Sequence, residues 1–343
     1  MVDPLGVKLN IKMFGKTCSI LLLFCVVSCI SKNKEIENWT QLNPTIQYES
    51  LNDSTYIFDI RNIVAYKDNF LLVNTSGNTI YLVSESYTLK EKIGEMGDGP
   101  GQYYNPQRIV FENDTLWVGD SGNQRINAYN LDGNYLLSFK TPEPFSLANG
   151  EFTKNGDYFF FHTLDGANSI IKYNYKTDAK SYFGNYTGDT NDRNSIFMND
   201  ALTNLHLTKK GDILTVNCQN SNINIYTSDG SLLHNYTYPN LLSNFKENIA
   251  MLEQTSRERS DSYVMIQNSY LDKDYLYLLL TSRIIKNTDN FSPNKIIKIN
   301  VENGKITDYY DLPDKVYLSV SAVENKLFAF NKVSSKIEVY NME

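Results

Sequence analysis

The chain has 343 residues, 41% of them hydrophobic and 13% aromatic, with 25 tyrosines, 17 phenylalanines and 18 glycines. This composition favours pleated, half-buried strands and tight turns over helices. The formal net charge is −7, and it becomes −9 when residues 1–28, with their three lysines and one aspartate, are set aside. An acidic body without a basic cluster excludes electrostatic capture of nucleic acid and suits a neutral or cationic ligand better.

The N-terminal segment has the pattern of an export signal. One lysine precedes an apolar run over residues 20–27, which is too short to span a bilayer but fits the core of a secretory signal. Val26-Val27-Ser28-Cys29 resembles the bacterial lipobox, which predicts a lipoprotein signal peptide at 1–28, with Met13 as an alternative start. An ordinary cleaved signal with an incidental cysteine is the alternative interpretation.

Lipidation of Cys29 would add a diacylglyceryl group and an amide-linked chain, and these two signals are enough for stable membrane anchoring. Ile30 stands where an aspartate would signal retention in the inner membrane, so outer-membrane delivery is expected, followed by a tether at 29–40. Cys18 and Cys25 leave with the signal, so Cys218 is the free thiol that remains. It ends an apolar strand with no histidine within several residues, and we expect it to pack rather than to act as a nucleophile.

The rest of the chain, 41–343, repeats one unit six times. An aliphatic residue followed three positions later by a large apolar one marks the third strand of each unit, at Ile80/Val83, Ile126/Tyr129, Ile170/Tyr173, Ile223/Tyr226, Ile296/Ile299 and Ile337/Tyr340. A nearly continuous apolar strand precedes each pair: NFLLVNTS, TLWVGDS, DYFFFHT, DILTVNC, YLYLLLTS and KLFAFNK. Asp-Gly or Asn-Gly turns follow three of the pairs, at 132–133, 229–230 and 303–304.

Four-stranded units at spacings of about 40–50 residues are typical of β-propeller blades. The observed spacings are 46, 44, 53, 73 and 41 residues, so two connections carry insertions. The sixth unit ends at its third strand, and residues 44–50 form a free strand of the right size to complete it. The sequence therefore predicts an all-β, six-bladed propeller whose ring is closed by pairing the two ends of the chain.

The stretch GDGPGQYYNPQ, residues 97–107, resembles the start of an NHL repeat, and LWVGDSGNQRINAYNLDG resembles its continuation. A phosphate-binding glycine loop is disfavoured here, because strand-like runs rather than a helix follow the glycines. Together with the lipobox, the chain resembles the six-bladed propeller lipoproteins with NHL-like repeats of Gram-negative gut anaerobes. Only the second blade keeps the detailed motif, because the other blades lack the equivalents of Asp120 and Arg125.

Propeller geometry places the connections between blades and the second-to-third turns at the same mouth of the channel. This mouth is the expected ligand site. Its candidate residues are Tyr103 and Tyr104 as stacking surfaces, Gln107 and Arg108 at the start of an innermost strand, and Asp120 with Arg125. For each of them a structural role in packing or turn formation is the alternative.

Both insertions are expected at this mouth as well. Residues 184–200 are polar and predict an ordered loop at most. Residues 241–260 place Leu242, Phe245, Ile249 and Leu252 at helical spacing, which predicts a lid helix on the rim, with a partner-binding surface as the alternative.

Catalytic interpretations are weaker. The zinc site that histidines form in propellers such as the peptidylglycine amidating lyases is disfavoured, because His162, His206 and His234 fall at different depths of their blades. A channel calcium, as in paraoxonase-like and gluconolactonase-like propellers, stays open through Asp59, Asn199, Asp200 and Asp261. The expectation is thus a lipid-anchored binding or scaffolding module for a glycan, peptide or protein, and the alternative is a calcium-dependent hydrolase or lyase.

Overall fold

The computed structural model describes the chain between residues 38 and 342, with gaps. The described residues are 38–51, 55–143, 151–163, 168–185, 203–218, 221–238, 241, 265–281, 293–313 and 316–342. All their regular elements are strands. None of these residues belongs to a helix with the length and apolarity needed to cross a membrane. The predicted signal peptide, Cys29 and most of the predicted tether lie outside the described residues.

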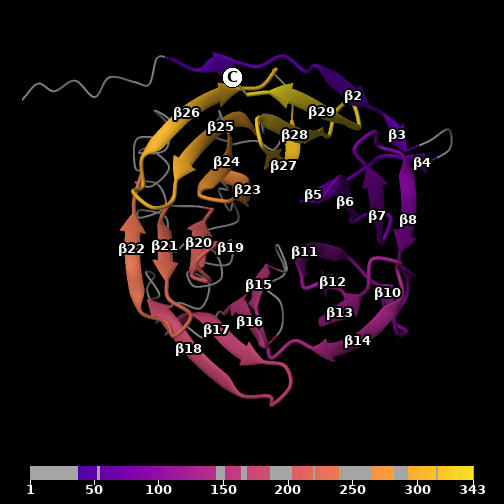
Figure 1. Cartoon of the computed structure of the whole chain (residues 1–343), viewed down its shortest axis with the longest axis vertical. Coiled ribbons are helices and arrows are strands. Elements are labelled where there is room, and N and C mark those ends of the chain that lie inside the picture. Colours follow the sequence, from indigo (N-terminus) through magenta and orange to yellow (C-terminus); the bar gives the residue numbers. More distant parts are fainter. Residues whose placement is uncertain are drawn as a thin grey trace, which may run out of the picture. The chain divides into compact units, whose positions relative to one another are not determined.

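Six blades, each with four antiparallel strands, stand around a central channel (Figure 1). The first blade contains β5 (Ile60–Tyr66), β6 (Asn69–Asn74), β7 (Thr79–Ser84) and β8 (Leu89–Ile93). The second contains β11 (Pro106–Glu112), β12 (Thr115–Asp120), β13 (Arg125–Tyr129) and β14 (Tyr135–Lys140). The third contains β15 (Phe152–Asn155), β16 (Tyr158–His162), β17 (Asn168–Asn174) and β18 (Lys180–Asn185).

The fourth blade contains β19 (Thr203–Leu207), β20 (Ile213–Asn217), β21 (Ile223–Tyr226) and β22 (Leu232–Tyr236). The fifth contains β23 (Ile266–Asp272), β24 (Tyr275–Thr281), β25 (Pro293–Asn300) and β26 (Ile306–Asp311). The sixth contains β27 (Tyr317–Val323), β28 (Lys326–Asn331) and β29 (Lys336–Asn341), with β2 (Ile46–Tyr48) as its outermost strand. The predicted six-bladed propeller is therefore confirmed.

Ring closure by the N-terminal strand is confirmed as well. β2 pairs antiparallel with β29, with Ile46 opposite Val339 and Tyr48 opposite Ile337. The sequence pattern did not predict β1 (Thr40–Gln41), which pairs parallel with β26 and gives the fifth blade a fifth strand. Two further small pairs, β3 (Ser50–Leu51) with β4 (Thr55–Tyr56) and β9 (Glu95–Met96) with β10 (Gln102–Tyr103), lie in connections between blades.

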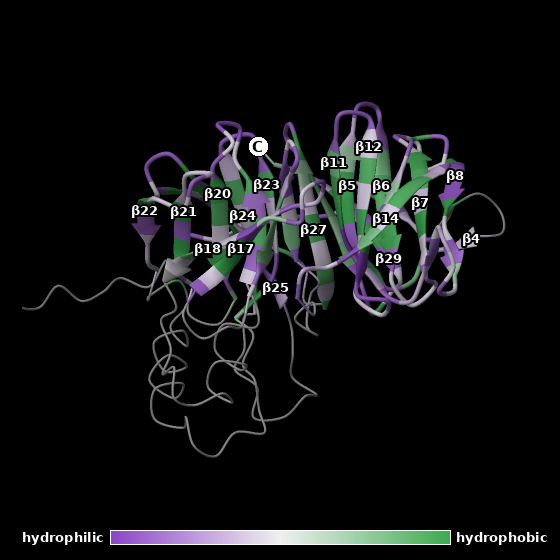
Figure 2. Cartoon of the chain, turned by 90° about the horizontal axis from the view of Figure 1, so that it is seen from below, coloured by the Kyte–Doolittle hydropathy of each residue, from purple (hydrophilic) through white to green (hydrophobic). Residues whose placement is uncertain are grey.

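The blades are held together by apolar side chains that alternate between two interfaces. In β6, Leu71 and Val73 pack toward the second blade, whereas Phe70 and Leu72 pack toward the sixth. Among the described residues, each of the six interfaces between neighbouring blades has such a cluster. Middle strands are apolar throughout because neighbouring blades cover both of their faces. The side view shows these apolar bands within the strands and polar turns at their ends (Figure 2).

The outermost strands meet neighbours on one side only. β14 and β22 are largely exposed along their length. The predicted turns before them are present, and Gly133, Gly230 and Gly304 have φ values of 76°, 97° and 68°, which L side chains adopt with strain. Strand direction alternates outward from the channel. The face of the propeller that carries the connections between blades and the turns between second and third strands is called the front face. The opposite face is called the rear face.

Candidate functional site

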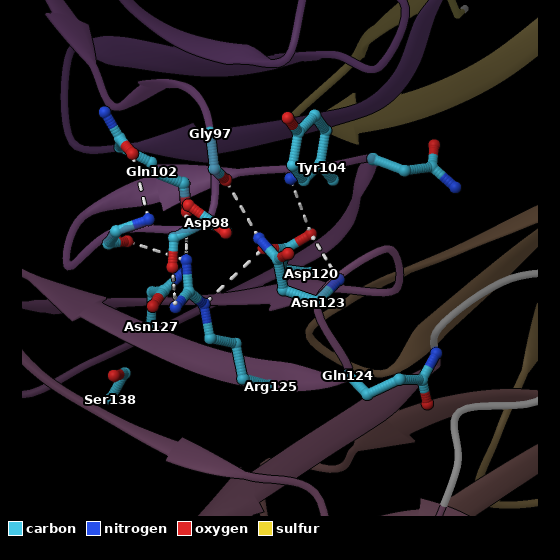
Figure 3. Close-up of polar contacts among 12 residues, drawn as sticks. Gly97, Asp98, Gln102, Tyr104, Asp120, Asn123, Gln124, Arg125, Asn127 and Ser138 are labelled. Carbon is cyan, nitrogen blue, oxygen red and sulfur yellow. Dashed lines mark hydrogen bonds and ion pairs between the residues drawn. The ribbon is translucent and has the colours of Figure 1, made fainter.

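The predicted residues Asp120 and Arg125 hold the glycine-rich loop in place (Figure 3). Arg125 donates from its guanidinium to the carbonyl oxygens of Asp98, Gly99 and Gln102, each at 2.8 Å. Asp120 is fully buried and accepts from the Tyr104 backbone N–H at 3.0 Å. Burial raises the pKa of the Asp120 carboxyl, while hydrogen bonds from Asn123 and Tyr104 oppose that rise. Both side chains are thus occupied by the loop itself.

Tyr103 and Tyr104 have different environments. Tyr103 has no exposed surface and packs against Tyr129 between the first two blades, with ring centroids 5.7 Å apart. The expected stacking role of Tyr103 is therefore wrong, because its ring serves the interface between blades. Tyr104 is 42% exposed at the front face, so its ring remains accessible.

A β-bulge occurs at the start of four innermost strands. The pairing of innermost and second strands shifts at Arg61 in β5, at Gln107 in β11, at Gln267 in β23 and at Leu318 in β27. A bulge adds one residue to a strand and re-aims its side chain. All four bulged residues line one cavity at the front face.

This front cavity has a volume of about 350 Å³. The side chains around it come from all six blades and are polar with one exception: Asp59, Arg61, Asn62, Thr75, Ser76, Asn105, Gln107, Glu151, Asn204, Gln267, Asn268 and Leu318. The volume lies at the lower end of the range for small-molecule sites. Gln107, predicted from the sequence, is therefore in the lining.

Some lining groups are already engaged within the protein. Arg61 Nε donates to Asp59 Oδ1 at 2.7 Å, and Gln107 Nε2 donates to Asn105 Oδ1 at 2.7 Å. The side-chain amides of Asn62 and Gln267 make no hydrogen bond to any described residue, although Asn62 is only 6% exposed. These amides have donors and acceptors available for a ligand.

The predicted residue Arg108 lies in the floor beneath the front cavity, where it contacts the lining residue Glu151 but does not itself line the cavity. Arg108 Nη2 donates to the carbonyl oxygen of Leu205 at 3.0 Å and to His206 Nδ1 at 3.2 Å. Arg108 Nε lies 3.5 Å from Glu151 Oε2, which also accepts from the Leu205 N–H at 3.4 Å. Burial raises the pKa of Glu151, whereas Arg108 and the Leu205 N–H lower it.

A second cavity of about 330 Å³, the rear cavity, lies on the other side of this floor. Its lining comes from the innermost strands of the first five blades: Val64, Ala65, Arg108, Ile109, Val110, Phe111, Glu112, Thr153, Lys154, His206, Leu207, Tyr270 and Leu271. Among the described residues, none lines both cavities.

His206 and Ser269 are close enough to suggest a serine–histidine pair, with Nε2 and Oγ 2.7 Å apart. Arg108 can only donate, so His206 Nδ1 accepts and the neutral ring carries its proton on Nε2. A base that activates serine needs the opposite arrangement, with an unprotonated Nε2. Burial, and then the Arg108 charge, lower the pKa of His206 well below its usual value. This pair is therefore arranged for structure rather than for nucleophilic catalysis.

The three histidines lie at the depths that the sequence predicted. His162 ends the second strand β16, His206 lies in the innermost strand β19, and His234 lies in the outermost strand β22. Among the described residues, no group of three or more histidine, cysteine or acidic side chains is placed to hold a metal. Asp59 contacts Arg61 and Ser76.

Other predicted features lie outside the described residues. These are Asn199, Asp200, Asp261, nearly all of the insertions 184–200 and 241–260, and the four apolar positions of the proposed lid helix. Cys218 is described, and it is buried in the cluster between the fourth and fifth blades. Burial raises the pKa of its thiol far above the usual value, as expected for a packing residue.

Sequence analysis missed Arg61, Asn62, Glu151 and Gln267. A signal was present, because Arg61 and Asn62 begin β5 as Gln107 and Arg108 begin β11. If the residues at these two positions had been selected in every repeat, most of the residues that line the front cavity would have been predicted. The bulges that turn these side chains inward leave no mark of their own in the sequence.

Comparison with known proteins agrees with this architecture. A family model, DUF5128, described as a 6-bladed beta-propeller, matches residues 46–327. A Bacteroides fragilis structure described as an exported protein has a TM-score of 0.59 at 12% identity, with 87% of this chain and 94% of that chain covered. No curated protein matches the sequence significantly.

Two further structures are similar. A DUF4221 member from Bacteroides vulgatus has a TM-score of 0.56 at 10% identity, covering 88% of this chain and 97% of its own. A streptogramin B lyase has a TM-score of 0.52 at 15% identity, covering 87% and 88%. Likeness at such identities shows the fold alone.

Proposed function

Because the chain belongs to the 6-bladed beta-propeller family DUF5128, we propose that it is a binding module whose front cavity takes a neutral, hydroxyl-rich ligand, namely a glycan. One observation carries the proposal: the cavity presents the unpaired amides of Asn62 and Gln267 around a polar interior. Amides donate and accept hydrogen bonds, and so do sugar hydroxyls, so a sugar can be bound without bringing a charge of its own into the cavity.

The charges around the cavity favour a neutral ligand. Arg61 is paired with Asp59, and Arg108 is paired with Glu151. A charged ligand would leave one of these balanced pairs with an excess charge in a partly buried site. Leu318 is the single apolar side chain of the lining, which disfavours a pocket for peptide side chains. Tyr104, exposed and next to Asn105 of the lining, would stack on a sugar face at the rim.

The proposed location is the cell envelope, at the outer membrane, with the propeller anchored through lipidated Cys29. Support comes from the lipobox-like residues 26–29 and from a fold neighbour that is described as exported. The NHL-like motif of residues 97–133 supports membership of the propeller lipoproteins that carry such repeats. Outer-membrane delivery follows from Ile30 and belongs to the same proposal.

Binding of the purified full-length chain to an array of neutral glycans, acidic glycans and peptides tests the function. We expect neutral glycans to bind. Asn62→Ala and Gln267→Ala should each raise the dissociation constant about 3- to 10-fold, as expected for one lost hydrogen bond. Asn134→Ala is the matched control, because Asn134 is exposed in a rear-face turn. Selective binding of peptides or acidic glycans, or binding that neither cavity variant weakens, would contradict the proposal.

The calcium-dependent hydrolase or lyase remains the alternative. Melting of the protein with calcium and with chelator distinguishes the two, since a metal bound to the native state raises the melting temperature. The binding proposal predicts the same melting temperature in both conditions. A calcium-dependent rise together with ester or lactone hydrolysis would support the enzyme.

A further inference from the structure

The Arg108 side chain reaches across the channel from the second blade to the fourth. Arg108 belongs to the innermost strand of the second blade, yet its partners Leu205 and His206 belong to that of the fourth. The guanidinium must therefore pass in front of β15, the innermost strand of the third blade. Arg108 is only 9% exposed, and Glu151 joins it from the third blade.

Polar contacts continue this layer around the ring. Asn204 Nδ2 and His206 Nε2 of the fourth blade meet Ser269 Oγ of the fifth, at 2.8 and 2.7 Å. Asn268 Oδ1 accepts from the Val320 N–H of the sixth blade at 3.1 Å.

Ser319 of the sixth blade donates to the Ile60 carbonyl oxygen of the first at 2.8 Å, which brings the layer back to the first blade. Ser319 has no exposed surface, and Ser269 is only 1% exposed. We call this layer the septum, defined by Arg108, Asn204, His206, Ser269, Asn268 and Ser319.

The septum separates the front and rear cavities, which share no lining residue. We infer that the front cavity is blind and that it recognises the terminal unit of a glycan chain rather than an internal stretch. This inference rests on the proposed function. A chain cannot thread through the channel past Arg108, and about 350 Å³ leaves room for about one or two sugar units.

Glu151 is the residue best placed to bind the terminal sugar of a glycan chain. Its Oε2 is fixed by Arg108 and by the Leu205 N–H, while Oε1 has no partner among the described residues. Oε1 is therefore free to accept from a hydroxyl at the floor of the cavity. Arg108 acts here as a positioning residue, because it orients the Glu151 carboxylate and closes the channel behind it.

The length dependence of binding tests this inference. The probes are cello-, malto-, manno-, xylo- and chito-oligosaccharides of one to six units, titrated by calorimetry into the full-length chain. For each series that binds, we expect dissociation constants that differ by less than about 3-fold between two and six units. Gln267→Ala should weaken every length equally, and Asn134→Ala should weaken none.

A second arm modifies the chain ends of the tightest series. A methyl group at the reducing end and a substituent at the non-reducing end should have unequal effects, with one of them weakening binding at least 10-fold. A rise in affinity of 10-fold or more from two to six units, or equal tolerance of both modifications, would overturn end recognition and leave glycan binding intact. No binding by any series would reject the proposed function and this inference together.

Discussion

Arg108 and Leu205 are 97 residues apart in the chain, yet Arg108 Nη2 donates to the Leu205 carbonyl oxygen at 3.0 Å across the channel. The free edge of an innermost strand needs partners for its carbonyl and N–H groups. A side chain from another blade provides one here, as Ser319 does for Ile60. The channel is therefore closed by the same contacts that satisfy the strand edges.

Arg108→Ala should destabilise the protein by about 3–5 kcal/mol, because the Glu151 carboxylate would stay partly buried without its cation. Urea denaturation monitored by tyrosine and tryptophan fluorescence measures the loss. The double variant Arg108→Met, Glu151→Met should recover part of it, since no buried charge is then unpaired. A cost below about 1 kcal/mol for Arg108→Ala would show that the pair is solvated.

Glu338→Ala should weaken ring closure. The buried Glu338 carboxylate accepts from Tyr317 at 2.8 Å, Tyr340 at 2.6 Å, Asn331 at 3.1 Å and, from β2, Gln47 at 3.2 Å. Removing it leaves the Tyr317 and Tyr340 hydroxyls with only each other as partners, at 2.9 Å, and leaves the buried Asn331 amide without its acceptor, at a cost of about 3 kcal/mol or more. Gln47→Ala serves as the comparison and should cost about 1 kcal/mol, because Gln47 is exposed. Equal losses for the two variants in thermal unfolding would be inconsistent with this account.

Stability should fall in mild acid through His162. Burial lowers the pKa of His162 from 6.5 to about 4. Between pH 6.5 and pH 4, His162 is protonated in the unfolded chain but stays neutral in the folded chain. The free energy of unfolding is therefore highest above about pH 6.5 and decreases as the pH falls toward 4. The loss at pH 5 is about 2 kcal/mol. His206 acts in the same direction.

Denaturant unfolding of the wild type and of His162→Gln at pH 7 and pH 5 checks this prediction. The variant should lose about 2 kcal/mol less than the wild type between the two pH values. An identical loss in both proteins would assign the acid sensitivity to other groups.

Gly122→Ala should be costly, because a Cβ at Gly122 would overlap the carbonyl oxygen of Tyr104. The glycine-rich loop would have to move away from the second-to-third turn, and we expect a loss of about 2–4 kcal/mol. Gly156→Ala is the comparison, since Gly156 has open space around it and a φ of +60°. That variant should lose only about 1–2 kcal/mol, the cost of a left-handed alanine. Similar melting temperatures for the two variants would be contrary to expectation.

Cys29→Ser tests the anchor. Without the thiol there is no acceptor for the diacylglyceryl group, so the protein should move from the membrane fraction to the soluble envelope fraction. Fractionation and immunoblotting of cells that express each form provide the measurement. A variant that remains in the membrane fraction would refute lipid anchoring at this residue.

Much of the fold was readable from the sequence because a propeller repeats local patterns. Pairs such as Ile126/Tyr129 mark a strand that neighbouring blades cover on both faces, and Gly133 marks the turn that follows. Ring closure also followed, since a blade that lacks its outermost strand needs a free one such as β2. The parallel strand β1 could not be foreseen, because two polar residues, Thr40 and Gln41, carry no periodic signal.

The site was less readable. Gln107 and Arg108 were predicted from their position at the start of a strand. The sequence did not show that Gln107 lines the front cavity whereas Arg108 lies in the floor beneath it. They were also grouped with Tyr103, which the interface between blades buries completely. Burial of that ring depends on the neighbouring blade, which sequence spacing does not specify.

The sequence by itself determined the number of blades, their strand order and the joining of the chain ends, because hydrophobic periodicity and turn residues act over short distances. The tertiary structure alone decided which polar side chains meet in the channel. Arg61, Glu151 and Gln267 are brought together from three blades by bulges and by the curvature of the ring. The same curvature allows Arg108 to reach Leu205 and make the cavity blind. Contacts between distant repeats are set by the geometry of closure, and local sequence patterns do not encode that geometry.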